Sequence, residues 1–89
     1  MKPFNASLLT GAQLRAARAL LGVSASDLAA TTKLGIATIR RAEANPGRVS
    51  MTPANAERLV RALEEAGVEF IPQNGGGGGV RLTRGEAHE

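Results

Sequence analysis

The chain has no cysteine, no tryptophan and no tyrosine among its 89 residues, and its only aromatic side chains are Phe4 and Phe70. Without cysteine, disulfides and thiolate zinc sites are excluded. With so few aromatic rings, the core has to be built from Leu, Ile, Val and Ala, a composition that favours packed helices over a β-sandwich. The length leaves room for one domain.

Long apolar runs are also missing. No stretch approaches the ~20 apolar residues of a membrane span, and Ser7, Thr10 and Gly11 interrupt the N-terminal segment where a signal peptide has a continuous apolar run. The one histidine, His88, stands near the end of the chain beside acidic residues, without the partners that a metal site needs. We therefore expect a soluble, cytoplasmic protein with no membrane contact, no bound metal and no cofactor.

Residues for catalysis are scarce as well. With no cysteine and a single terminal histidine, the sequence offers its serine hydroxyls no evident base. A phosphate loop is followed by a helix that opens with Lys and Ser or Thr, and the five-glycine run 75–79 is followed by no such helix. We expect a flexible hairpin connection there. We therefore expect that the protein is not an enzyme.

Positive charge is in mild excess. Eleven Lys and Arg against eight Asp and Glu give a net charge of +3, and nine of the eleven cations are arginine. The planar arginine fork suits phosphates and guanine edges, so this composition indicates a nucleic-acid partner. Arg58 and Arg61 are interspersed with glutamates at helical spacing, and we expect them, like Arg15 and Arg18, to have structural roles.

Local start and stop signals predict four helices. The first two open with a hydroxyl residue followed three positions later by Gln or Asp, which is the spacing of a capping box. A Thr-Pro pair opens the longest helix, and glycine or the turn sequence Asn-Pro-Gly ends three of the four. The expected helices run from Thr10 to Gly22, from Ser24 to about Thr32, from about 36 to 44, and from Thr52 to Gly67.

A short hairpin is expected after the last helix. Residues 68–71 alternate in polarity like a strand, and residues 80–82 supply a second strand after a turn-rich loop. The fold class is therefore all-α, with four helices and a C-terminal β-hairpin over 68–82. We expect one domain over 10–82, a flexible N-terminal arm over 1–9, and a disordered tail over 83–89.

The two short helices have the spacing of a helix-turn-helix. Ala29 is small where the helices must approach closely, and Leu34, Ile39 and Ala42 follow at five, ten and thirteen residues, each apolar and placed to face one core. In a helix-turn-helix the first helix braces the second against DNA. The spacing therefore predicts that helix 36–44 is the one presented to a partner.

The chain resembles the XRE family of small bacterial and phage regulators, the group of the lambda and Cro-type repressors. The resemblance runs from about Thr10 to Leu82, and its matching segments are LRAARALLGVSASDLA, ATIRRAE and TPANAERLVRALEEAGVEFIP. It implies a lambda-repressor-like fold, sequence-specific binding to double-stranded DNA, and transcriptional regulation. We expect a repressor that acts as a homodimer, with its two recognition helices in successive major grooves about 34 Å apart.

The same resemblance implies roles for individual residues. The residues that open the second short helix are expected to contact base edges, together with one residue that lies a helical turn further along. Residues around that helix and at the start of the first short helix are expected to contact phosphates. The base-contacting candidates are Ile36, Ala37, Thr38 and Arg41, and the phosphate-contacting candidates are Ser24, Ser26, Lys33, Arg40 and Arg48.

Physical chemistry supports part of this assignment. Arg40 and Arg41 lie about 100° apart on a helix, so both stay on or beside an exposed face when Ile39 points inward. An arginine reads guanine through O6 and N7, and a threonine at position 38 suits a thymine methyl or a phosphate. The alternative is that both arginines only solvate a surface helix.

A second function stays open. Ile36 and Ala37 offer no hydrogen bonds to bases, and the edge of strand 68–71 is suited to pairing with another chain. The alternative is therefore a protein-binding module on the same fold, such as an antitoxin or antiactivator, that acts through a protein partner. A homodimer joined through the hairpin is compatible with either function.

Overall fold

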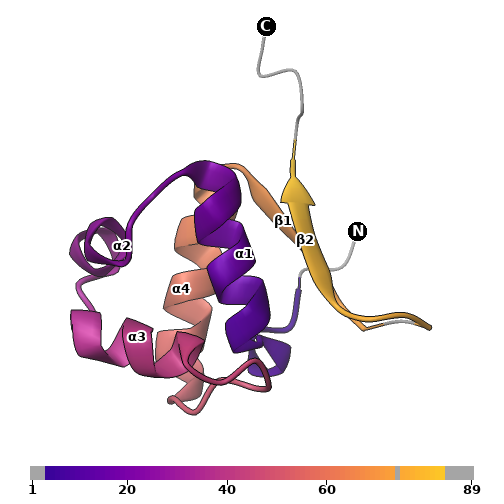
Figure 1. Cartoon of the computed structure of the whole chain (residues 1–89), viewed down its shortest axis with the longest axis horizontal. Helices are drawn as coiled ribbons and strands as arrows, with labels where there is room; N and C mark the ends of the chain where they lie inside the picture. The colour runs from indigo at the N-terminus through magenta and orange to yellow at the C-terminus, as the bar shows by residue number, and fades with distance from the viewer. Residues whose placement is uncertain (1–3, 74, 84–89) are drawn as a thin grey trace, which may run out of the picture.

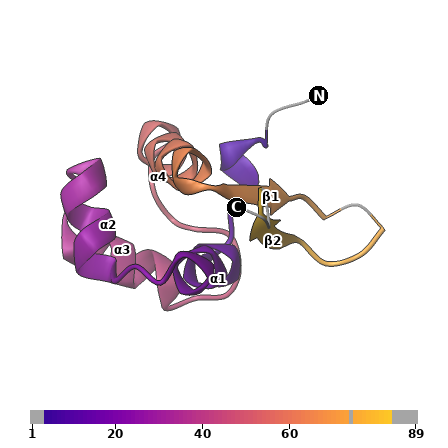
Figure 2. The same cartoon turned by 90° about the horizontal axis from the view of Figure 1, so that it is seen from above.

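Four α-helices and a two-stranded antiparallel sheet form the protein, in a computed structural model that describes residues 4–73 and 75–83. Helices α1 and α4 lie in the middle, α2 and α3 lie at one end, and the hairpin lies at the opposite end (Figure 1, Figure 2). The mostly helical fold with a hairpin, predicted from the sequence, is confirmed. The elements are η1 (Ala6–Leu8, a 3-10 turn), α1 (Gly11–Leu21), α2 (Ala25–Thr32), α3 (Ile36–Glu43), α4 (Pro53–Ala66), β1 (Val68–Ile71) and β2 (Gly79–Leu82).

The capping signals begin and end the helices where the sequence predicts. At the start of α1 the Thr10 hydroxyl accepts from the Gln13 N–H, and the Gln13 side chain accepts from the Thr10 N–H, both at 3.1 Å. Ser24 and Asp27 form the same box on α2. Gly22 ends α1 in the left-handed conformation that suits glycine. The third helix ends at Glu43, one residue earlier than expected.

The core is aliphatic apart from one ring, as the composition predicts. It joins α1, α2, α3 and α4 to the inner face of the hairpin, where only Phe70 is aromatic. Of the four residues whose spacing suggested a shared core, Ile39 and Ala42 are buried, and Ala29 and Leu34 pack partly buried against the cluster. The buried core residues are Leu9, Leu14, Ala17, Leu28, Ile39, Ala42, Leu59, Val60, Leu63, Val68 and Phe70.

The expectation of a flexible N-terminal arm over 1–9 is wrong for the part that the structure describes, residues 4–9. This segment packs onto the domain, because it carries apolar side chains that the core buries. Leu9 is fully buried, and the Phe4 ring stacks on Phe70 with 5.2 Å between ring centroids. The Asn5 side chain caps η1 by accepting from the Ser7 N–H at 3.0 Å. Residues 1–3 of the expected arm and residues 84–89 of the expected tail lie outside the described residues.

The hairpin packs on α1 through the apolar core, and one polar side chain of α1 also bonds to it. Its strands pair antiparallel with Val68 opposite Leu82 and Ile71 opposite Gly79. The buried Gln13 amide donates to the carbonyl oxygens of Ile71 at 3.0 Å and of Gly79 at 3.1 Å. Gln13 therefore serves two purposes, since its oxygen caps α1 while its nitrogen holds the hairpin where the strands leave the sheet.

The beginning of α1 lies against the end of α3. The Gly11 N–H donates to the Gly47 carbonyl at 2.9 Å, and the Val49 N–H donates to the Leu9 carbonyl at 3.0 Å. An isolated β-bridge between Thr10 and Arg48 belongs to the same contact. These backbone bonds fix the loop after α3, and they thereby set the position of α3 relative to α1.

Candidate nucleic-acid interface

Helices α2 and α3 are joined by a three-residue turn, residues 33–35, that is stabilised from within. The buried Thr32 hydroxyl donates to the Leu28 carbonyl at 2.8 Å and accepts from the Leu34 N–H at 3.4 Å. Lys33 ends α2 with φ of 62°, the one positive φ outside glycine among the described residues. Gly35 begins α3 in an extended conformation without a side-chain cap.

Lys33→Gly is expected to stabilise the protein, because a non-glycine residue in the left-handed region carries a penalty of about 1 kcal/mol that glycine avoids. We expect the midpoint of thermal unfolding to rise by about 4–8 °C. The matched control is Lys33→Ala, which removes the same charge but keeps a Cβ at positive φ. An equal rise in both variants would show that the gain comes from the charge and not from the backbone.

The exposed side of α3 consists of the predicted contact residues. Because Ile39 is fully buried, helical periodicity directs Ala37 and Arg41 away from the core and places Thr38 and Arg40 on opposite flanks. Ala37, Arg40 and Arg41 are exposed and Thr38 is half-buried. Ile36, the first residue of the helix, is also half-buried, so it presents only part of its side chain to a partner.

The one acidic residue of α3 faces inward and is neutralised there. Glu43 accepts from the Arg18 guanidinium at both oxygens, each at 2.7 Å, and Arg18 also donates to the Val23 carbonyl at 3.1 Å. The hydrogen bonds that Arg18 donates to Glu43 are the main reason that the pKa of Arg18 is raised. Burial acts to lower this pKa, and the charge attraction of Glu43 also raises it. Arg18 therefore has the structural role expected, and it removes the carboxylate from the exposed side of α3.

Four cations around α3 have no ion pair with any described residue. They are Lys33 before the helix, Arg40 and Arg41 on it, and Arg48 after it, and all four are exposed. The described ion pairs join Arg18 to Glu43, Arg61 to Glu57 and Arg81 to Glu69. Along the chain between residues 28 and 56 the only acidic residue is the buried Glu43, although Glu57 and Glu65 of α4 line the same groove as Lys33. The exposed side of α3 and the loop after it are therefore positive.

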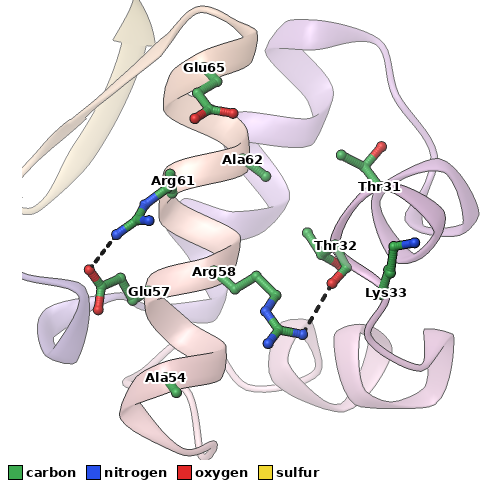
Figure 3. A pocket seen from close by; sticks show the side chains of 9 residues that line it. All are labelled: Thr31, Thr32, Lys33, Ala54, Glu57, Arg58, Arg61, Ala62 and Glu65. Atoms are coloured by element: carbon green, nitrogen blue, oxygen red, sulfur yellow. Dashed lines mark hydrogen bonds and ion pairs between the residues drawn. The ribbon is translucent and has the colours of Figure 1, made fainter.

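Lys33 and Arg48 lie at different places around α3. Lys33 lines a groove of about 530 Å³ between α2 and α4, opposite Arg58, whose guanidinium donates to the Thr32 carbonyl at 3.4 Å (Figure 3). Arg48 lies in the loop that docks on the start of α1, so its backbone is fixed while its side chain is exposed. Cations therefore lie before α3, on it and after it, and the helix itself is about 12 Å long.

The start of α2 brings Ser24 and Ser26 to the surface, but beside a carboxylate. Asp27 accepts from the Ser24 N–H at 3.1 Å, and the Ser24 hydroxyl accepts from the Asp27 N–H at 2.9 Å. Both serines are exposed. The Ser24 hydroxyl can still donate its own proton to a phosphate, whereas the Asp27 charge weakens the attraction of this helix start for anions.

Sequence reasoning missed the residues that hold α3 in place. Gly11, through its contact with the loop after α3, and the pairing of Arg18 with Glu43 connect segments that are distant in sequence, so no local pattern indicated them. Within the described part of the chain, no three His, Cys, Asp or Glu residues gather as a metal site would require. No helix in that part is long and apolar enough to span a bilayer.

Comparisons of the chain with protein-family models, with curated proteins and with solved structures find no match. The arguments for its function therefore come from its own residues: an exposed, positive helix held at a fixed position by α1 and by the turn after α2.

Proposed function

We propose that the protein binds double-stranded DNA in a sequence-specific manner, with α3 in the major groove, and regulates transcription as a repressor. In this proposal α2 and α3 form the helix-turn-helix of a lambda-repressor-like domain of the XRE family, and two copies bind a two-fold operator. The observation that carries the proposal is the set of four exposed cations without described ion pairs on and around α3.

The dimensions and chemistry of α3 suit the groove. An α-helix with its side chains is about 10–12 Å across and fits a major groove about 12 Å wide, and Arg41 projects from the outward side of α3, where a base edge would lie. Arg41 is the residue able to read guanine by two hydrogen bonds, and Thr38 suits a thymine methyl. Ala37 beside Arg41 is small, so it lets the helix approach the bases closely but adds only apolar contact.

Phosphate contacts would supply most of the affinity. Arg40, Lys33 and Arg48 surround the helix, and the serines at the start of α2 add hydroxyl donors. Each phosphate neutralised releases counterions, so the logarithm of the binding constant falls with the logarithm of salt concentration by about 0.9 per contact. With three phosphate-contacting cations we expect a slope of about −3 per chain.

The test is a titration of the protein with the promoter DNA beside its own gene, at two salt concentrations. We expect Arg40→Ala/Arg41→Ala to weaken binding by about 30-fold or more, since the base contact of Arg41 is worth about 1–3 kcal/mol and the phosphate contact of Arg40 is lost as well. The salt slope should become shallower by about 1, the contribution of Arg40. The matched control is Arg58→Ala/Arg61→Ala, which removes the same charge from α4.

Equal loss in the two double variants would show that net charge alone drives binding, and it would contradict a reading role for α3. Binding of the unaltered chain no tighter than to unrelated DNA would contradict sequence specificity. Tight binding that does not respond to salt would also count against the proposal, because it would exclude the phosphate contacts.

A protein-binding module is the second candidate, and two observations favour it. The open strand edge is that of β2 and not, as expected, that of strand 68–71, where Val68 and Phe70 are buried. In addition, α3 begins with Ile36 and Ala37, which have no hydrogen-bonding side chains. An antitoxin or antiactivator would capture a stoichiometric protein partner, and the capture would survive charge reversal at Arg40 and Arg41. Absence of such a partner together with tight DNA binding would remove this candidate.

A further inference from the structure

The outer edge of β2 has backbone groups without partners in the domain. The Thr83 N–H donates to the Gly67 carbonyl at 2.7 Å, which makes residues 67 and 83 a hydrogen-bonded pair of the hairpin. Because such pairs alternate in an antiparallel ladder, the N–H and C=O groups of Val80 and Leu82 point away from β1. None of the loop or side-chain hydrogen bonds among the described residues reaches these groups.

The opposite edge of the sheet is covered. On β1 the backbone groups that point away from β2 belong to Val68 and Phe70. Both residues are buried, and Phe4 stacks on the Phe70 ring. Nothing comparable covers β2. Its sequence has no proline, its pairing has no bulge, and its one charge belongs to Arg81, which is held by Glu69 at 3.0 Å. Apart from its short length and Arg81, whose charge Glu69 neutralises, β2 therefore has none of the features by which proteins usually protect an edge strand.

The two most exposed large apolar side chains meet this edge. They are Leu20 on α1 and Leu82 on β2, exposed by 44% and 43%. Gln13 of α1 contacts Gly79, and Leu20 lies seven residues further along the same face of the helix, about 10 Å away. Leu82 lies three residues further along β2, also about 10 Å away. Figure 1 shows α1 and β2 side by side along this length, as their packing requires.

The side of α1 next to Leu20 carries small residues. Helical periodicity places Ala16 beside Leu20, turned away from the buried Leu14, and places Ala12 and Ala19 further round the helix. All three alanines are exposed, and they line one shallow hollow together with Arg15 and Arg18. The β2 edge, the two leucines and Ala16 therefore form one continuous surface, the β2 side, where α1 meets the hairpin. The hairpin itself lies at the end of the molecule opposite α2 and α3 (Figure 2).

We propose that the β2 side binds a second copy of this chain through antiparallel pairing of β2 with its two-fold mate. The two-fold axis passes beside Arg81, so that Val80 of each copy pairs with Leu82 of the other and a four-stranded sheet results. Among the symmetric registers, this one uses both outward-facing residues of β2, Val80 and Leu82. Both side chains lie on the helix-facing side of the sheet, opposite Phe70 and Val68, and there they meet Leu20 of both copies.

Charge favours a second copy on this side. The chain has a net charge of +3, and the surface around α3 would repel its own copy because of its four cations. On the β2 side Arg81 already has a counter-ion, and its hydrogen bonds lower the pKa of the Glu69 carboxyl, so the pair stays ionised and neutral in sum. Pairing here leaves both α3 helices uncovered. The interface rests on the proposed function in one respect, that a two-fold operator requires two copies.

Because the chain has no cysteine, a single introduced one tests the register directly. In the proposed dimer the two Arg81 residues form a non-hydrogen-bonded pair with Cα atoms about 4.5 Å apart, within the range of about 4.4–6.8 Å that a disulfide spans. We expect full-length Arg81→Cys to form a covalent dimer on mild oxidation. The matched control is Glu69→Cys, on the same face of β1, where the two Cα atoms would be about 14 Å apart and no cross-link forms.

Sedimentation equilibrium without DNA measures the association itself. Leu82→Lys is expected to raise the dimer dissociation constant about tenfold or more, whereas Thr83→Lys, the next residue on the opposite face of the strand, leaves it nearly unchanged. Circular dichroism checks that both variants fold. A monomer at all concentrations, cross-linking of Glu69→Cys in place of Arg81→Cys, or equal effects of the two lysines would overturn the proposal.

The DNA-binding proposal and the dimer proposal can be tested separately. Arg40→Ala/Arg41→Ala is expected to remain dimeric while losing DNA. A chain that cross-links through Arg81→Cys but binds no DNA keeps the dimer and removes the proposed function. A monomeric chain that binds DNA in a salt-dependent manner does the reverse, and it leaves the β2 edge to a partner of different sequence.

Discussion

Gly11→Ala is expected to destabilise the protein by about 4 kcal/mol, although alanine is the better helix former by about 1 kcal/mol. A Cβ at this position would overlap the carbonyl oxygens of Ala42 and Asn45. Both are backbone atoms, so no rotamer change relieves the overlap, and α1 has to move away from the end of α3. Overpacking usually amounts to about 1–3 kcal/mol, and loss of the Gly11 hydrogen bond to Gly47 adds to it.

The measurement is chemical denaturation followed by circular dichroism. A domain of this size has about 4–13 kcal/mol of stability in all, so the variant is expected to lose much of its folded population. Gly76→Ala is the matched control, because no described atom lies within 4 Å of its added Cβ and its φ is not positive. We expect it to change stability by less than about 0.5 kcal/mol. A neutral or stabilising Gly11→Ala would show that α1 and α3 are not in contact at this point.

The contrast between Gly11 and the capping residues shows what the sequence can predict. The Thr10–Gln13 and Ser24–Asp27 boxes lie within four residues of chain, so the same residues that suggested helix starts also form the hydrogen bonds. The contact of Gly11 with the end of α3 joins residues more than thirty apart in the chain. Gly11 is the first residue of α1. Nothing in the neighbouring sequence shows whether a glycine there allows two backbones to approach closely or is simply a poor helix former.

The candidate site follows the same division. Periodicity alone predicted that Arg40 and Arg41 are exposed, because Ile39 had to face inward, and both are exposed. That Glu43 is buried and paired could not be predicted, since its partner Arg18 lies 25 residues away. The arm was missed for a related reason: Phe4 and Leu9 are apolar, but only the fold supplies Phe70 and the core against which they pack.

Removal of either member of the Arg18–Glu43 pair is the second large effect that we expect. The two side chains are only 23% and 10% exposed, so Glu43→Ala leaves Arg18, a largely covered side chain, without its carboxylate partner. Breaking a buried pair destabilises by about 3–5 kcal/mol, and the partial exposure of Arg18 reduces this to about 2–3 kcal/mol. Urea denaturation of the variant measures the loss.

The matched control is the pair of Arg61 with Glu57, which has the same residue types at 2.8 Å but is 65% and 61% exposed. We expect Glu57→Ala to destabilise by at most about 0.5 kcal/mol, because water replaces the carboxylate. The double variant Arg18→Met/Glu43→Leu is expected to regain most of the stability lost in Glu43→Ala, since it leaves no buried charge. If Glu43→Ala and Glu57→Ala had equal effects, burial would not decide the strength of the pair, and Arg18 would not be what holds α3 to α1.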